Sequence, residues 1–104
     1  MHTFFYSLMF WTDWGEIPKI ERSGMNGDPE TRKVIVNTNI FWPNGLTIDY
    51  ESELIYWIDG NLRFLEVMTY DGRNRTVLLK TGFEYPFGLT MFEKKLFWTD
   101  WKTW

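Results

Sequence analysis

The sequence predicts an all-β fold, a partial β-propeller of about two and a half four-stranded antiparallel blades. Aromatic residues make up 20% of the chain, and sheet faces are the surfaces that accommodate so many rings. A tetrapeptide of the form aromatic-Trp-x-Asp occurs three times, at intervals of 46 and 41 residues. Its copies are Phe10-Trp11-Thr12-Asp13, Tyr56-Trp57-Ile58-Asp59 and Phe97-Trp98-Thr99-Asp100. This period is typical of propeller blades.

Two further markers repeat in the same order. Trp42-Pro43-Asn44-Gly45-Leu46-Thr47 matches Tyr85-Pro86-Phe87-Gly88-Leu89-Thr90 at an offset of 43, and Met25-Asn26-Gly27 matches Tyr70-Asp71-Gly72 at an offset of 45. Because three independent markers share nearly one period, chance is a poor explanation.

The central repeat predicts four strands, at residues 46–49, 54–59, 63–69 and 74–79. Pro43-Asn44-Gly45 suits a tight turn before the first strand, and Asp71-Gly72 is a hairpin signal before the last. Alternation in the second strand places Leu54, Tyr56 and Ile58 on one face, and Ile55, Trp57 and Asp59 on the other.

Counting strands divides the chain into a ragged N-terminal extension (1–7) and a partial propeller (8–104). The propeller holds a partial blade (8–36), with strands predicted at residues 8–13, 17–23 and 31–36. A complete blade (45–79) and a second partial blade (86–104) follow. Propellers usually close with about 4–8 blades, so we expect a fragment of a longer protein. The apolar start lacks the basic head and small-residue cleavage site of a signal peptide, and the sequence has no apolar stretch of membrane-spanning length.

The repeated residues are best interpreted as architecture. Trp11, Trp57 and Trp98 can fill the space between adjacent blades. Asp13, Asp59 and Asp100 end their strands, where a carboxylate can accept main-chain N–H groups and tie one blade to the next. A residue that recurs once per blade is a poor candidate for catalysis.

Little in the sequence favours an enzyme. Cysteine is absent, His2 is the only histidine, and neither a phosphate-binding loop nor a dinucleotide motif occurs. We therefore predict no catalytic residue, no metal and no cofactor. A net charge of −3 gives no basic surface for nucleic acid.

Positions at which the repeats differ are more informative about binding. Asn44 occupies the position of Phe87 in the next blade; Trp14 and Trp101 follow two of the tetrapeptides, whereas Gly60 follows the third. Asn44 can serve as a turn residue, a binding residue or both, and loop tryptophans are frequent binding anchors. Asn74-Arg75-Thr76 is the only N-glycosylation sequence, on the predicted outermost strand of the complete blade.

These motifs resemble the low-density lipoprotein receptor class B (YWTD) repeats over nearly the whole chain. Residues 10–22, 42–51 and 86–93 are most similar to the Wnt co-receptor branch of the lipoprotein receptor-related proteins. Ile58 departs from the usual threonine, and the loop at residues 26–33 is about two residues longer than in that branch.

The resemblance implies a six-bladed extracellular propeller, usually followed by an EGF-like module, in a single-pass receptor of the plasma membrane. In that branch one propeller face binds secreted Wnt-type ligands, and antagonists that present an Asn-x-Ile-like segment to an asparagine. Carried over by motif, this asparagine is Asn44, with Trp42, Trp101 and Tyr85 around it. An amide suits the role because it both donates and accepts hydrogen bonds.

Four hypotheses follow. We favour a ligand-binding segment of a Wnt co-receptor-like receptor, which takes part in Wnt signalling. The alternatives are a segment of an endocytic lipoprotein-type receptor or basement-membrane propeller, a propeller-type hydrolase, and a truncated product with no independent function. The hydrolase finds no convincing ligand set in this sequence.

Overall fold

The structure is a computed structural model that describes residues 8–25 and 29–101. The predicted extension 1–7, residues 26–28 of the predicted longer loop and residues 102–104 of the last predicted blade lie outside the described residues.

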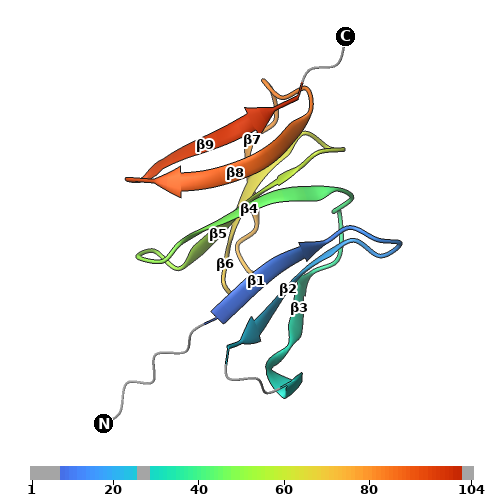
Figure 1. The fold of residues 1–104 in the computed structure, drawn as a ribbon, viewed down its shortest axis with the longest axis vertical. Helices are drawn as coiled ribbons and strands as arrows, with labels where there is room; N and C mark the ends of the chain where they lie inside the picture. Colours follow the sequence, from blue (N-terminus) through green and yellow to red (C-terminus); the bar gives the residue numbers. More distant parts are fainter. Residues whose placement is uncertain (1–7, 26–28, 102–104) are drawn as a thin grey trace.

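The described residues form three antiparallel sheets that follow one another along the chain (Figure 1). The first sheet contains β1 (Leu8–Asp13), β2 (Lys19–Gly24) and β3 (Lys33–Val36), with a short 3-10 turn, η1 (Pro29–Thr31), before β3. The second contains β4 (Pro43–Asp49), β5 (Leu54–Asp59), β6 (Phe64–Thr69) and β7 (Thr76–Leu79). The third contains β8 (Pro86–Phe92) and β9 (Lys95–Asp100). Within each sheet every strand pairs with its neighbour in sequence, so the predicted all-β fold class is confirmed.

Both faces of the central sheet are packed, each against a different neighbour. Ile55 and Trp57 of β5 are fully buried against the first sheet, in a cluster made of Ile20, Val36, Ile40, Ile55, Trp57 and Met68. Ile58 is fully buried in a second cluster with Leu65 and Phe83, and Leu89 and Leu96 of the third sheet pack against it. The alternation predicted for β5 is therefore confirmed, and each face of the strand forms one inter-sheet contact.

Four predicted strand starts were one or two residues too early, for local reasons. Pro18 has no N–H to donate to a sheet, so β2 begins after it. Thr31 lies in η1, where its hydroxyl accepts the N–H of Gly24 at 3.0 Å. Arg63 and Asn74 have left-handed φ angles of 61° and 54°, which place them in turns before β6 and β7.

The interpretation of Pro43-Asn44-Gly45 as a turn was wrong, because these residues open β4. Pro43 pairs with Asp59 and Gly45 with Ile58, so Asn44 is the extra residue of a β-bulge. Proline is tolerated as the first residue of a strand, where its missing N–H costs the sheet little. A bulge redirects the side chain of the extra residue, which bears on the role of Asn44.

The Asp59 carboxylate joins two consecutive sheets. It is fully buried, and it accepts the N–H groups of Phe41 at 2.7 Å and Trp42 at 3.2 Å, in the segment between β3 and β4. It also accepts the N–H groups of Asn61 at 2.9 Å and Leu62 at 3.1 Å, in the turn after β5. One side chain thus fixes both the turn in its own sheet and the segment that arrives from the preceding sheet.

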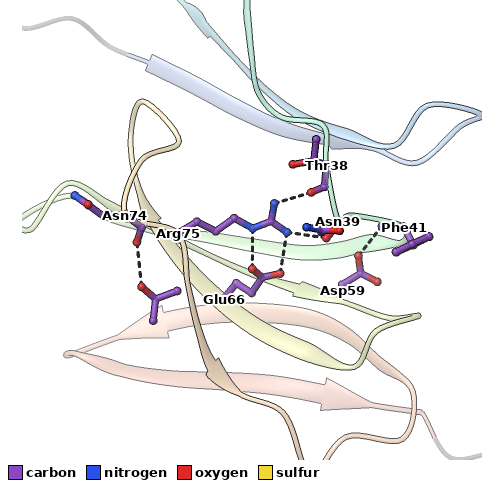
Figure 2. A network of polar contacts seen from close by, with 8 residues as sticks. Thr38, Asn39, Phe41, Asp59, Glu66, Asn74 and Arg75 are labelled. Carbon is purple, nitrogen blue, oxygen red and sulfur yellow. Dashed lines mark hydrogen bonds and ion pairs between the residues drawn. The ribbon is translucent and has the colours of Figure 1, made fainter.

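The same segment is also held through two of its main-chain carbonyl oxygens (Figure 2). The Arg75 guanidinium donates to both carboxylate oxygens of buried Glu66, at 2.8 and 3.2 Å, and lies 5.1 Å from the Trp57 ring centre. It also donates to the carbonyl oxygens of Thr38 at 2.6 Å and Asn39 at 2.7 Å. We call Trp57, Glu66 and Arg75 the central clamp.

The first sheet contains the same arrangement, which was not predicted from the sequence. Arg32 donates to both oxygens of buried Glu21, at 2.9 and 3.1 Å, and lies 5.6 Å from the Trp11 ring centre. The hydrogen bonds from Arg32 are the main reason that the pKa of Glu21 lies below its usual value. The two glutamates lie 45 residues apart and the two arginines 43, so the repeat spacing alone could have paired them.

Replacing Arg75 by methionine should destabilise the chain by about 2–4 kcal/mol, because Glu66 would remain buried without its cation. The matched control is Arg73→Met: the Arg73 side chain is 82% exposed and pairs with a half-exposed Asp71. We expect that control to change the free energy of unfolding by less than about 0.5 kcal/mol. Urea unfolding followed by tryptophan fluorescence measures both, and equal effects would contradict a structural role for the central clamp.

Candidate functional site

A hollow of about 320 Å³ lies where ends of strands from the three sheets meet, and we call it the aromatic hollow. Trp14 follows β1, Gly60 follows β5 and Trp101 follows β9, while Asn44 and Phe87 come from the beginnings of β4 and β8. Its lining consists of Trp14, Trp42, Asn44, Gly60, Tyr85, Pro86, Phe87 and Trp101. All five side chains that were predicted from the sequence to bind a ligand are among them.

The rings of the aromatic hollow are not part of either buried cluster. Trp14 and Trp101 are 60% and 62% exposed, and Trp42, Tyr85 and Phe87 are about half exposed. Single exposed apolar side chains are ordinary, but a contiguous group of large ones is typical of a binding surface. Keeping these rings in contact with water costs free energy that a partner could recover.

The central and third sheets share one main-chain hydrogen bond beside the aromatic hollow. The N–H of Gly60 donates to the carbonyl oxygen of Trp42 at 2.8 Å, and the N–H of Trp101 donates to that of Tyr85 at 2.8 Å. In the third sheet Trp101 stacks on Phe87, with ring centres 5.0 Å apart and planes inclined by 19°. The side chains beside this hydrogen bond therefore differ between the two sheets, whereas the hydrogen bond itself is the same.

In the central sheet the corresponding pair is Asn44 and Gly60. The Asn44 amide donates from Nδ2 to the carbonyl oxygen of Pro86, at 3.0 Å, and so reaches the neighbouring sheet. A Cβ added at Gly60 would collide with this Nδ2. The missing side chain at position 60 is what makes room for the amide, which also has a carbonyl oxygen and a second N–H.

Tyr85 is held at the rim by two charged neighbours. The Arg63 guanidinium lies 5.7 Å from the ring centre, within the range of a cation–π contact. The Asp100 carboxylate accepts the N–H of Tyr85 at 2.7 Å and that of Glu84 at 2.9 Å. These two hydrogen bonds, Tyr85 first, lower the pKa of Asp100 because they stabilise its ionised form.

Among the described residues, no group of three or more His, Asp or Glu side chains is placed to hold a metal ion. The part of the chain that the structure describes also contains no helix long and apolar enough to cross a membrane.

Asn74 is exposed in the connection between β6 and β7 and does not line the aromatic hollow. The contribution of Pro86 was missed, because a main-chain carbonyl leaves no trace in the sequence.

A family model described as low-density lipoprotein receptor repeat class B matches residues 7–50. The vitellogenin receptor Yl of Drosophila melanogaster is 44% identical over 96 residues, and the vitellogenin receptor of Solenopsis invicta 38% identical over 95. These matches cover 92% and 91% of this chain, and 5% of each receptor. The human low-density lipoprotein receptor-related protein 5-like protein is 35% identical over 95 residues, which is 91% of this chain and 37% of that protein.

Among solved structures, the crystal structure of a nidogen/laminin complex contains a similar chain. The TM-score is 0.78 at 37% sequence identity, and the match covers 90% of this chain and 35% of that one. In every case the chain spans well under two thirds of the matched protein.

Replacing Gly60 by alanine should displace the Asn44 amide from Pro86 while leaving the fold intact, because the far end of a flexible side chain can move aside. We expect a stability loss below about 1 kcal/mol and a clear shift of the Asn44 side-chain amide signals in a 1H–15N NMR spectrum. Gly15→Ala is the matched control, since its Cβ would meet only the Asp13 carboxylate at an ordinary 3.6 Å. An unmoved Asn44 signal in Gly60→Ala would contradict the coupling of these two positions.

Acid should weaken the hydrogen bonds that the Asp100 carboxylate accepts from Glu84 and Tyr85. The lowered pKa of Asp100 means that its stabilising bonds are complete at neutral pH and are lost as the pH falls through that lowered value. The amide signals of Glu84 and Tyr85 should therefore titrate together in NMR spectra, and Asp100→Asn should remove the step. A midpoint at or above that of an ordinary aspartate would show that the two N–H groups do not hold the carboxylate.

Proposed function

The chain belongs to the low-density lipoprotein receptor class B repeat family, and from that premise we propose that its aromatic hollow binds a protein ligand on the extracellular part of a receptor. The observation that carries the proposal is the convergence of Trp14, Trp42, Asn44, Tyr85 and Trp101 on one hollow. These residues lie at the ends of strands from three different sheets. Trp42, Tyr85 and Trp101 take part in a main-chain hydrogen bond that the central and third sheets share.

The chemistry of the hollow suits an extended segment of a secreted protein. The half-exposed rings offer an apolar surface to an aliphatic side chain, and burial of such a chain contributes about 1.5–3 kcal/mol. Asn44 offers an amide that is held in place by Pro86 and can pair with a side-chain amide of the ligand. An Asn-x-Ile segment combines both features, and this supports a Wnt co-receptor-like role for the receptor.

A second candidate is a vitellogenin-type lipoprotein receptor. It is favoured by the two vitellogenin receptors, which are 44% and 38% identical to this chain, against 35% for the receptor-related protein 5-like protein. Two of these relatives are named as receptors, which favours recognition over catalysis for this chain. In this candidate the same hollow contacts a folded lipoprotein rather than a short peptide.

The test measures the Kd of the purified protein for two probes, a synthetic peptide with an Asn-x-Ile segment and purified vitellogenin. Asn44→Ala should weaken binding of the probe that is recognised by about tenfold, and Trp101→Ala by about thirtyfold. Tyr50→Ala is the control, since Tyr50 is 74% exposed but follows the end of β4 that is remote from the aromatic hollow.

The two probes separate the candidates. Recognition of the peptide alone supports the Wnt co-receptor-like role, and recognition of vitellogenin alone supports the lipoprotein receptor. An Asn44→Ala protein that binds its probe as tightly as the unmodified protein would show that the aromatic hollow is not the binding site.

A further inference from the structure

The connection between β6 and β7 presents the sequence Asn74-Arg75-Thr76 in a form suited to N-glycosylation. Asn74 and Thr76 are both exposed, and Asn74 has a left-handed φ of 54° that lifts it out of the strand. The Thr76 hydroxyl donates to the carbonyl oxygen of Asn74 at 3.1 Å. Figure 2 shows the Asn74 side chain directed away from the Glu66 carboxylate.

Arg75, between them, is turned the other way. Its guanidinium is engaged by Glu66 and by the carbonyl oxygens of Thr38 and Asn39. The middle residue of the acceptor sequence is thus anchored in the central clamp, while the two residues that define the sequence remain at the surface. An attached sugar at Asn74 therefore need not disturb the clamp.

Asn74 also lies at the opposite end of the central sheet from the aromatic hollow. It lines a shallow polar depression with Ser52 and Glu53, which belong to the turn that follows β4. Strand β4 begins at the hollow with Pro43 and Asn44 and ends beside that turn. With a rise of about 3.3 Å per residue, the strand separates the two ends by about 20 Å.

We infer that Asn74 is an N-glycosylation site and that its glycan covers the end of the central sheet remote from the aromatic hollow. In the reaction the Asn74 Nδ2 attacks the anomeric carbon of an oligosaccharide carried on a polyprenyl diphosphate. A carbon–nitrogen bond forms, the bond from that carbon to the diphosphate oxygen breaks, and Nδ2 loses one proton as the polyprenyl diphosphate leaves. The inference rests on the extracellular location in the proposed function, because the modification occurs on secreted chains.

The consequence for partners follows from this geometry. A branched glycan excludes protein contacts around Ser52, Glu53 and Asp71, which surround Asn74. The aromatic hollow stays open, since none of these residues lines it. Glycosylation would therefore restrict protein recognition to the end of the sheet that carries the exposed rings.

The test is secretion of the full chain from mammalian cells behind a heterologous signal sequence, followed by peptide mass mapping. We expect a glycan on the Asn74 peptide that a peptide:N-glycosidase removes, with conversion of Asn74 to aspartate. Asn74→Gln and Thr76→Val should abolish it, whereas Thr76→Ser should retain it because serine also completes the acceptor sequence. An unmodified Asn74 peptide from the secreted protein would overturn the inference.

Asn44→Ala separates this inference from the proposed function. The mass measurement needs no ligand, and we expect the variant to carry the glycan at the same occupancy as the unmodified chain. A fall in glycan occupancy in Asn44→Ala would overturn the claim that glycosylation of Asn74 does not depend on the aromatic hollow.

Discussion

The Asp59 carboxylate is buried, and among the described residues its hydrogen-bond donors are four main-chain N–H groups. A buried charge is tolerated only when such donors replace the water it has lost, so the segment at Phe41 and Trp42 must stay where the carboxylate needs it. Asp100, whose side chain is exposed, accepts the N–H groups of Glu84 and Tyr85 at the corresponding place in the third sheet. The spacing of the sheets is therefore tied to an electrostatic requirement as well as to apolar packing.

The segment between β3 and β4 is held by charges of both signs. Arg75 donates hydrogen bonds to the carbonyl oxygens of Thr38 and Asn39. Asp59 accepts hydrogen bonds from the N–H groups of Phe41 and Trp42, which follow in the same segment. Each charge thereby supplies hydrogen-bond partners for main-chain groups of a connection between two sheets. Trp42 reaches the aromatic hollow from this doubly fixed segment, which gives the ring a defined position without burying it.

Local rules predicted most of the fold from the sequence, and the errors show where they stop. The alternation in β5 identified both packed faces, since every side chain in a strand must point one way or the other. The Pro43-Asn44-Gly45 error arose because turns and bulges share residue preferences, and the pairing of Gly45 with Ile58 is what decides between them. Asn44, Trp14 and Trp101 could be found because the repeats differ at their positions, and Trp42 and Tyr85 were added by the family resemblance. The Pro86 carbonyl required coordinates, and the central clamp required either coordinates or a closer comparison of charged residues between repeats.

The aromatic hollow also shows how a repeated scaffold can carry a unique surface. The main-chain bonds that close each sheet at this end, from Gly60 to Trp42 and from Trp101 to Tyr85, do not involve side chains. The bulge residue and the residue after the aspartate are therefore free to vary, but not independently of each other. Asn44 can reach Pro86 only because position 60 has no side chain, so the pair, rather than either residue alone, determines which surface a blade presents.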